Sequence, residues 1–247
     1  DEILHMGLLD YIRSKVDNVS YITQDKLYDF IKLNCKHINV IKESQYQKDL
    51  HFSKKLNLAS LIHYIEDWKT FSKEKLIWES DKAKKIEYKK KYKTKNEKII
   101  GISWKSKNEK IGDEKSFALE EFVPIFQKNK IISLQYGEVK DELDHINKKY
   151  NTEIILDNNL DYYNDINSLA SLISICDVVV TCSNVTAHLA GRLGINCYVL
   201  VPKFFGRIWY WNDDEQSSWY PSVKLIKQEE DGIWIKEIQK INYLINN

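Results

Sequence analysis

The stretch Val178–Gly191, with the sequence VVVTCSNVTAHLAG, decides the fold. Val178–Thr181 is a run of β-branched residues, which predicts a buried strand, and Thr186–Leu193 has the apolar spacing of a helix. Ser183 and Asn184 lie between the two and are residue types that favour a helix N-cap. In open α/β sheets, ligands bind where a strand ends and leads into a helix.

The same alternation extends along the chain on both sides of this stretch. Apolar segments predict five strands, at residues 99–104, 131–135, 153–156, 178–181 and 197–201. Helical spacing lies between them, at residues 119–127, 140–150, 168–174 and 186–193. Residues 105–115 read as a polar loop. Strands that alternate with helices predict a parallel sheet with helices on both faces.

The first part of the chain shows a weaker form of the pattern. Helical spacing at residues 1–14, 25–33 and 56–65 alternates with strand-like segments at 19–23 and 38–41. This predicts a second, small α/β layer. A solvated helix is expected at residues 81–91, a linker at 92–97 and a last helix at 233–245.

Composition limits the class of protein. Of the 247 residues, 43% are hydrophobic and 30% charged, which is typical of a soluble globular protein. The formal net charge of +1 argues against a broad nucleic-acid-binding surface. No apolar run is long enough to span a bilayer, and no signal peptide is visible. The four cysteines form no C-x-x-C pair, so we expect reduced thiols in a cytoplasmic protein and no metal site.

The segment Ser183–Gly191 is a candidate site for a phosphate. The first turn of a helix exposes unpaired N–H groups and the positive end of the helix dipole. The hydroxyls of Ser183 and Thr186 can add donors there. The same residues also fit an ordinary N-cap, and His188 on the next turn also fits a packed histidine.

Other candidates follow the neighbouring predicted strands. Lys115 could pair with a diphosphate as a point charge, although loop lysines are usually only solvated. Gln135 and the backbone at Gly137 end a strand where a nucleobase or ribose could be read. Asn164 could contact the nucleoside, whereas Asp165 beside it fits a helix cap.

Together these segments resemble the C-terminal half of bacterial glycosyltransferases that are often fused to tetratricopeptide repeats. Those are similar to the ADP-heptose lipopolysaccharide heptosyltransferases of family 9 and, more remotely, to O-GlcNAc transferase. The resemblance covers residues 99–228. It rests on an ordered set of segments, Gly101–Trp104, Lys115–Ser116, Ser133–Gln135, Ser183–Gly191 and Trp219–Ser222.

The resemblance implies a GT-B type α/β fold with two Rossmann-like domains and parallel sheets. The N-terminal domain, residues 1–95 with the linker, would present the acceptor and is expected to be small or truncated. Residues 96–228 would bind the nucleotide sugar. Residues 229–247 would form a helix that packs back on the N-terminal domain.

The resemblance also assigns roles to residues. Asp1–His5 resembles the Gly-Asp segment after the first strand of these enzymes, whose Asp is regarded as the general base. Asp1 and His5 are therefore the catalytic candidates, although the preceding Gly and strand are absent from this sequence. The candidates for donor binding are Lys105, Lys115, Gln135, Tyr136, Asn164, Ser183, Asn184, Thr186, Ala187 and His188.

One departure from the heptosyltransferases concerns the donor sugar. They carry Asp-Thr-Gly where this chain has Ser183-Asn184-Val185, so the sugar need not be a heptose. The resemblance implies metal-independent, inverting transfer from a nucleoside-diphosphate sugar, which is a substrate and not a cofactor, to a glycan, lipid-linked or protein acceptor. No tetratricopeptide repeat is present in this sequence, but repeats could lie upstream in a longer chain.

Two other functions stay open on sequence grounds. The first is a non-catalytic nucleotide-sugar-binding or scaffold protein derived from such a transferase. The second is a sugar-nucleotide epimerase of similar fold, which needs carboxylates and histidines from both domains, and the sequence offers no convincing set of these. A thermal-shift panel of nucleotide sugars, followed by a hydrolysis assay, separates these hypotheses.

Overall fold

A six-stranded parallel sheet forms the centre of the computed structural model, which describes residues 2–47, 51–66, 77–94, 97–126, 129–211 and 215–247. Its strand order is β5-β4-β3-β6-β7-β8, and every pair in it is parallel. The strands are β3 (Ile99–Ser103), β4 (Lys130–Ser133), β5 (Ile154–Ile155), β6 (Val178–Cys182), β7 (Cys197–Val201) and β8 (Val223–Lys227).

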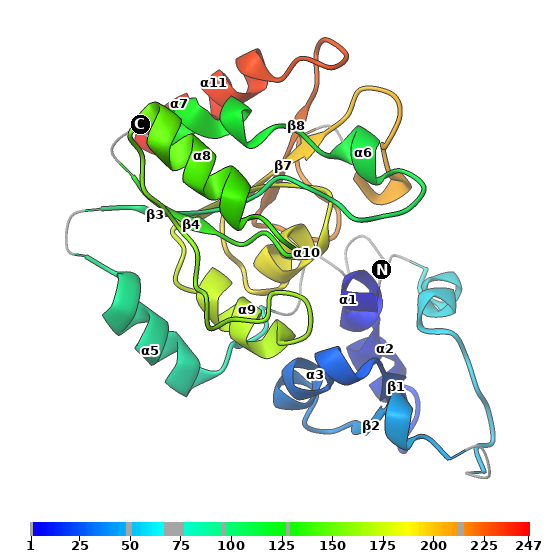
Figure 1. The fold of residues 1–247 in the computed structure, drawn as a ribbon. Coiled ribbons are helices and arrows are strands. Elements are labelled where there is room, and N and C mark those ends of the chain that lie inside the picture. Colours follow the sequence, from blue (N-terminus) through cyan, green and yellow to red (C-terminus); the bar gives the residue numbers. More distant parts are fainter. Residues whose placement is uncertain (1, 48–50, 67–76, 95–96, 127–128, 212–214) are drawn as a thin grey trace.

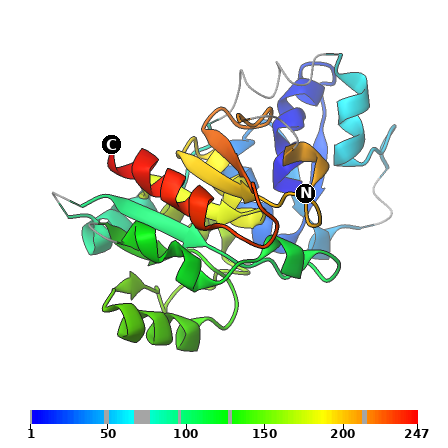
Figure 2. The same cartoon turned by 90° about the horizontal axis from the view of Figure 1, so that it is seen from above.

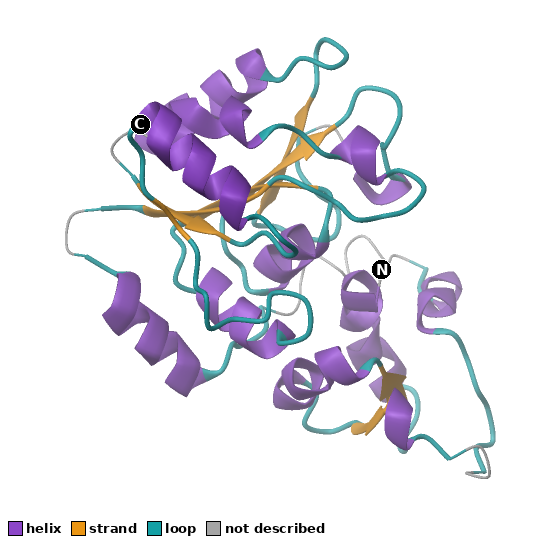
Figure 3. Ribbon diagram, viewed as in Figure 1, coloured by secondary structure: helices purple, strands orange, loops and turns teal. Residues whose placement is uncertain are grey.

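Helices cover both faces of this sheet (Figures 1 and 3). Ile100 and Ile102 of β3 pack into one hydrophobic cluster, and Ile99 on the same strand packs into another. Successive side chains of a strand point to opposite faces, so the two clusters are the two cores. The first core is closed by α7 (Val123–Phe126), α8 (Lys140–Tyr150) and α11 (Ile235–Asn246), and the second by α9 (Ile166–Ile173) and α10 (Val185–Arg192).

The N-terminal part is a small α/β unit whose two strands, β1 and β2, are parallel. It packs against the second core, through α1 on α10 and α3 on α9 (Figure 2). The helix α5 (Lys82–Tyr92) follows it and also packs on α9. The elements of the unit are α1 (Glu2–His5), η1 (Met6–Leu8), α2 (Leu9–Arg13), β1 (Ser20–Thr23), η2 (Asp25–Leu27), α3 (Tyr28–Asn34), β2 (Asn39–Lys42), η3 (Glu43–Gln45) and η4 (Leu58–Tyr64).

Four details differ from the sequence-based expectations. A sixth strand, β8, lies in a segment where no strand was expected. The expected loop at 105–115 contains a short helix, α6 (Gly112–Lys115). The first helix is divided into α1, η1 and α2, and the helix expected at 56–65 is the 3-10 helix η4.

The last helix, α11, also lies elsewhere than expected. In place of the predicted packing on residues 1–95, it packs on α7 and on η5 (Leu119–Phe122). Its apolar residues Ile238, Ile241 and Ile245 are buried in the first core, which explains this position. Within the part of the chain that the structure describes, none of the helices combines the length and the hydropathy needed to cross a bilayer.

Candidate functional site

A cavity of about 970 Å³ opens in front of the N-terminus of α10. One side is formed by the N-terminal unit, with Glu2, Gln24 and Lys26. The other side is formed by the segments that follow β3, β4, β6 and β7. The carboxyl ends of parallel strands are where open α/β sheets bind ligands, so the cavity lies where the sequence predicts a site.

Asn184 organises the helix N-terminus that faces this cavity. Its side-chain oxygen accepts a hydrogen bond from the Thr186 amide at 2.9 Å and so caps α10. Its side-chain nitrogen donates to the Ser103 hydroxyl at 2.7 Å and to the Lys105 carbonyl at 3.2 Å. Ser183, Asn184 and Val185 all line the cavity. An anion in the cavity would therefore meet the positive end of an eight-residue helix.

Lys115 brings a positive charge to the same cavity. It is the last residue of α6, lines the cavity and is only 4% exposed. The structure records no carboxylate within ion-pair distance of its ammonium among the described residues. Burial lowers the pKa of Lys115, because it removes water from the charged form. A buried ammonium without a carboxylate is costly, and a bound phosphate would relieve that cost.

The loop that carries Lys115 is held against the end of β3. Ser116 accepts a hydrogen bond from the Ser106 amide at 2.9 Å and donates one to the Gly112 carbonyl at 2.7 Å. Gly112 is required for this approach, because a Cβ there would lie 2.5 Å from the Ser106 carbonyl oxygen. The position of Lys115 in the cavity wall is thus set by local packing.

His188, on the second turn of α10, also lines the cavity and is 5% exposed. Its ring stacks on Trp211, with the ring centroids 5.3 Å apart and an interplanar angle of 18°. Its Nδ1 atom lies 3.1 Å from the hydroxyl oxygen of Tyr220. Burial, together with the positive charges of Arg192 and Lys115, holds the pKa of His188 well below its usual value. The imidazole is therefore neutral at neutral pH.

Two tyrosines form an aromatic wall elsewhere in the cavity. The ring centroids of Tyr136 and Tyr163 are 6.3 Å apart, and the Lys107 amide donates to the Tyr136 hydroxyl at 2.8 Å. Tyr163 is 57% exposed, and the Lys26 ammonium lies 4.0 Å from the centroid of its ring. Such rings offer flat faces on which a planar base can stack.

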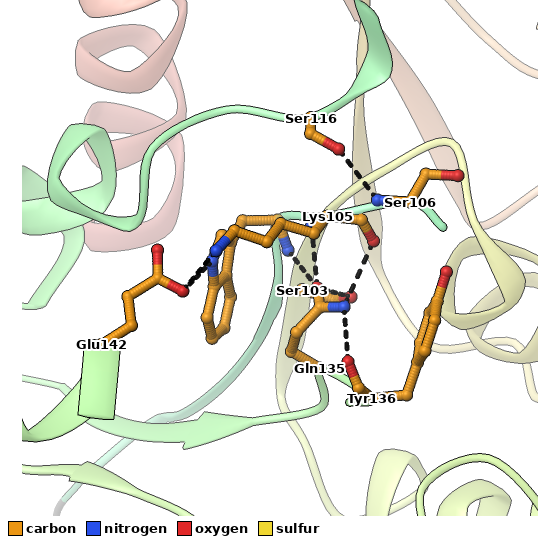
Figure 4. Close-up of polar contacts among 8 residues, drawn as sticks. Ser103, Lys105, Ser106, Ser116, Gln135, Tyr136 and Glu142 are labelled. Carbon is orange, nitrogen blue, oxygen red and sulfur yellow. Dashed lines mark hydrogen bonds and ion pairs between the residues drawn. The ribbon is translucent and has the colours of Figure 1, made fainter. Parts of the chain in front are cut away.

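Gln135 has a different role from the predicted contact with the nucleoside (Figure 4). Its side-chain oxygen accepts hydrogen bonds from the Ser103 hydroxyl and from the amides of Trp104 and Lys105. Its side-chain nitrogen donates to the carbonyls of Lys105 and Tyr136. Gln135 is buried, does not line the cavity and holds together the two loops that do.

Lys105 also points elsewhere than predicted. Its ammonium forms an ion pair with Glu142 of α8 at 2.6 Å, and it does not line the cavity (Figure 4). Glu142 also accepts a hydrogen bond from the Trp104 indole at 3.2 Å. The ion pair draws the lysine toward the first core, away from the candidate site.

Three further predicted donor-binding residues lie outside the cavity wall. Thr186 and Ala187 are completely buried, and the Thr186 hydroxyl oxygen has no hydrogen-bond partner among the residues that the structure describes. Asn164 is exposed and donates its side-chain hydrogen bond to Asp161. Asp165 caps α9, which matches the structural interpretation of that residue.

The structure describes only one of the two catalytic candidates near the start of the chain. Asp1 lies outside the described residues. His5 is buried, packs edge-on against Trp219 and does not line the cavity. Burial and the charge of Arg192 lower the pKa of His5 to about 4. The catalytic role expected of His5 stays a prediction.

Glu2 is a cavity residue that the sequence analysis missed, because the motif resemblance points to its neighbour Asp1. Its carboxylate lines the cavity and accepts hydrogen bonds from Tyr21, Thr23 and Gln24. Trp209 also lines the cavity and is 54% exposed.

Comparison with known proteins identifies the fold. No profile of a known protein family matches the sequence. The structure is similar to that of a family 9 glycosyltransferase from Veillonella parvula, with a TM-score of 0.63 and 11% identity, over 97% of this chain and 87% of that one. It is equally similar to ADP-heptose lipopolysaccharide heptosyltransferase II from E. coli, with a TM-score of 0.63 and 10% identity, over 100% of this chain and 96% of that one.

One curated protein matches in sequence. Protein FlbA from Caulobacter vibrioides is 28% identical over 140 residues, which are 55% of this chain and 23% of FlbA. The chain thus matches less than a quarter of the length of that relative. The predicted GT-B type α/β fold, and the resemblance to the heptosyltransferases as a likeness of fold, are confirmed.

Proposed function

We propose that this chain is a glycosyltransferase that binds a nucleoside-diphosphate sugar in the cavity in front of α10. The observation that carries the proposal is the buried ammonium of Lys115, which lines the same cavity as the first turn of that helix. Cationic and dipolar groups that converge in this way favour a diphosphate. The likeness of fold to family 9 glycosyltransferases supports the same conclusion.

The proposed chemistry is displacement of the nucleoside diphosphate from the sugar. Negative charge develops on the leaving phosphate oxygen as the bond to the sugar breaks. Lys115 and the N-terminus of α10 stabilise that charge, so the residues present supply the electrostatic part of catalysis. A bound diphosphate would also raise the pKa of Lys115 again, which keeps the ammonium charged during the reaction.

The proposed division of labour follows the two sides of the cavity. Residues 96–228 bind the donor, with the base near Tyr136 and Tyr163. Residues 1–95 present the hydroxyl of a glycan, lipid-linked or protein acceptor. A carboxylate near the start of the chain takes the proton of that hydroxyl as it attacks with inversion. Asp1 is the proposed base.

The donor sugar in this proposal is not restricted to a heptose. The residues Ser183, Asn184 and Val185 at the entry to α10 carry no carboxylate, in contrast to the Asp-Thr-Gly that the heptosyltransferases carry there. A neutral helix entry also avoids repulsion between a carboxylate and the diphosphate.

Calorimetry with UDP, ADP and GDP tests the proposal. We expect at least one of them to bind wild-type protein, and Lys115→Ala to weaken that binding about ten- to hundredfold, because one charged hydrogen bond is lost. Lys140→Ala is the matched control, since Lys140 lies exposed on α8 and pairs with Asp144. Equal affinities of wild-type protein and Lys115→Ala would remove Lys115 from the site.

Turnover separates an enzyme from a binding protein. With the nucleotide sugar whose base binds best, a transferase should release nucleoside diphosphate, slowly to water and faster with an acceptor. Lys115→Ala should reduce this rate by more than tenfold. Binding without release of nucleoside diphosphate for any sugar would favour the non-catalytic alternative.

A further inference from the structure

The Nδ1 atom of His188 has one recorded partner within the described part of the chain, the hydroxyl of Tyr220 at 3.1 Å. A neutral imidazole carries its proton on one nitrogen and accepts on the other, and its neighbours decide which. If the tyrosine hydroxyl donates to Nδ1, the imidazole proton must be on Nε2. The hydrogen position of Tyr220 therefore decides what His188 offers to the cavity.

Arg192, one turn further along α10, places a positive charge beside Tyr220. The carbon of its guanidinium lies 5.2 Å from the centroid of the Tyr220 ring. A nearby cation makes a phenol hydroxyl a stronger hydrogen-bond donor, because it stabilises negative charge on the oxygen. The charge of Arg192 therefore favours donation from the hydroxyl of Tyr220 to Nδ1 of His188.

The Nε2 atom of His188 is open to the cavity. Within the described residues, the structure records no hydrogen bond to Nε2. The atom is also not completely buried. Because His188 lines the cavity, solvent or a ligand reaches Nε2 from there. With the proton on Nε2, the ring adds a neutral donor to the cation of Lys115 and the amides of α10.

We propose that Tyr220 is a positioning residue that holds His188 in its Nε2–H form, so that the imidazole donates a hydrogen bond to a phosphate oxygen of the nucleoside diphosphate. The proposal rests on the proposed function of the cavity. The other tautomer would direct a lone pair at the anion, and the two would repel each other.

The arrangement leaves Tyr220 and Arg192 little freedom. The guanidinium of Arg192 donates to the Leu4 carbonyl of α1 at 2.8 Å. A Cβ on Gly7 would lie 2.5 Å from one of its nitrogens, and a Cβ on Gly191 would lie 2.4 Å from the Tyr220 ring. The contacts thus run from the N-terminal unit through Arg192 and Tyr220 to His188, and tie the two sides of the cavity together.

Nitrogen-15 NMR of labelled histidine tests the tautomer directly, without any ligand. We expect the wild-type signals of His188 to show a protonated Nε2 and an unprotonated Nδ1 near neutral pH. Tyr220→Phe should move the ring to the Nδ1–H form or to a mixture of the two. The signals of His188 are identified among the six histidines as those that His188→Gln removes.

Tyr210→Phe is the matched control, because the Tyr210 ring also packs on His188, at 5.3 Å, without a bond to Nδ1. It should leave the tautomer unchanged. A wild-type ring with its proton on Nδ1, or a Tyr220→Phe variant that keeps the Nε2–H form, would overturn the proposal.

A double-mutant cycle with UDP or ADP tests the effect on binding. Tyr220→Phe should weaken the binding of the nucleoside diphosphate about three- to tenfold in the wild-type background. In the His188→Gln background the loss of affinity should be less than twofold. An equal loss in both backgrounds would show that Tyr220 does not act through His188. If wild-type protein binds neither nucleotide, the proposed function fails. The NMR result alone then tests whether Tyr220 sets the tautomer of His188.

Discussion

The side-chain nitrogen of Asn184 donates to the hydroxyl of Ser103 at 2.7 Å, a contact between residues 81 positions apart. It joins the end of β6 to the end of β3, and the same side chain caps α10 through its oxygen. One asparagine thereby fixes the distance between the helix N-terminus and the loop that leads to Lys115. The geometry of the candidate phosphate site depends on this link.

Asn184→Ala should therefore lower both stability and ligand binding. We expect a loss of about 1–3 kcal/mol in the free energy of unfolding, because a cap and a buried hydrogen bond are lost together. Denaturant titration measures it, and calorimetry should show weaker binding of nucleoside diphosphate. Asp81→Ala, which removes the cap of α5, is the control and should leave nucleotide affinity unchanged. Unchanged affinity in Asn184→Ala would contradict the role of this link.

Lys115→Met should stabilise the protein while it weakens ligand binding. The methionine fills a similar volume and removes a buried charge that has no recorded carboxylate partner among the described residues. We expect the free energy of unfolding without ligand to rise by about 1 kcal/mol at pH 7. Because the pKa of Lys115 is lowered in the folded state, wild-type protein should gain stability as pH rises toward the unfolded pKa, and the variant should lack this gain. A destabilised variant would show that the ammonium has a favourable partner.

Lys105→Ala should leave nucleotide affinity within about twofold of wild type, since its ammonium pairs with Glu142 outside the cavity. Exposed or half-exposed ion pairs contribute roughly 0–1 kcal/mol, so stability should also change little. Calorimetry of this variant beside Lys115→Ala compares the two lysines among the sequence-predicted donor-binding residues. A tenfold loss of affinity in Lys105→Ala would mean that Lys105 turns toward the ligand.

His5 should make the protein sensitive to mild acid. Its pKa falls from 6.5 when unfolded to about 4 when folded, so the unfolded chain binds the proton first. The contribution of neutral His5 to the free energy of unfolding is then fully present above pH 6.5. It is lost as pH falls toward 4, by about 3 kcal/mol. The pKa of His188 is lowered as well and adds to the same slope. His5→Phe keeps an aromatic ring against Trp219 and should flatten part of this slope in denaturant titrations from pH 4 to 7. An identical slope in the variant would rule out a buried neutral His5.

The aromatic wall of Tyr136 and Tyr163 should contribute to binding of the nucleobase and not to binding of the phosphates. Tyr163→Ala should weaken the binding of a nucleoside diphosphate about three- to tenfold, because stacking is lost. The affinity for inorganic pyrophosphate should be unchanged, because the phosphate contacts remain. Tyr243→Ala on α11, also an exposed tyrosine, is the control. Equal losses for both ligands would place Tyr163 at the phosphates.

Sequence patterns predicted the large sheet well, because five of its strands are apolar runs that alternate with helical segments. They missed β8, whose sequence VKLIK places two lysines in a short strand that follows an aromatic-rich segment. The cap at Asn184 and the position of Lys115 in the cavity wall agree with expectation, since both follow from where strands end in a parallel sheet.

The sequence could not show which side chains of these loops enter the cavity. Lys105 and Gln135 follow the strands as expected, but distant partners, Glu142 and the backbone of the neighbouring loop, hold their polar atoms. The contact between His188 and Tyr220 joins residues 32 positions apart, and no local sequence pattern predicts it. Tertiary hydrogen bonds of this kind decide the function of a loop residue.

A crystal structure with the nucleoside diphosphate that binds most tightly tests the central claim most directly. The account predicts a phosphate oxygen within hydrogen-bond distance of the Lys115 ammonium, and another at the N-terminus of α10. A diphosphate bound elsewhere, or a start of α10 closed off by protein in that crystal, would contradict it.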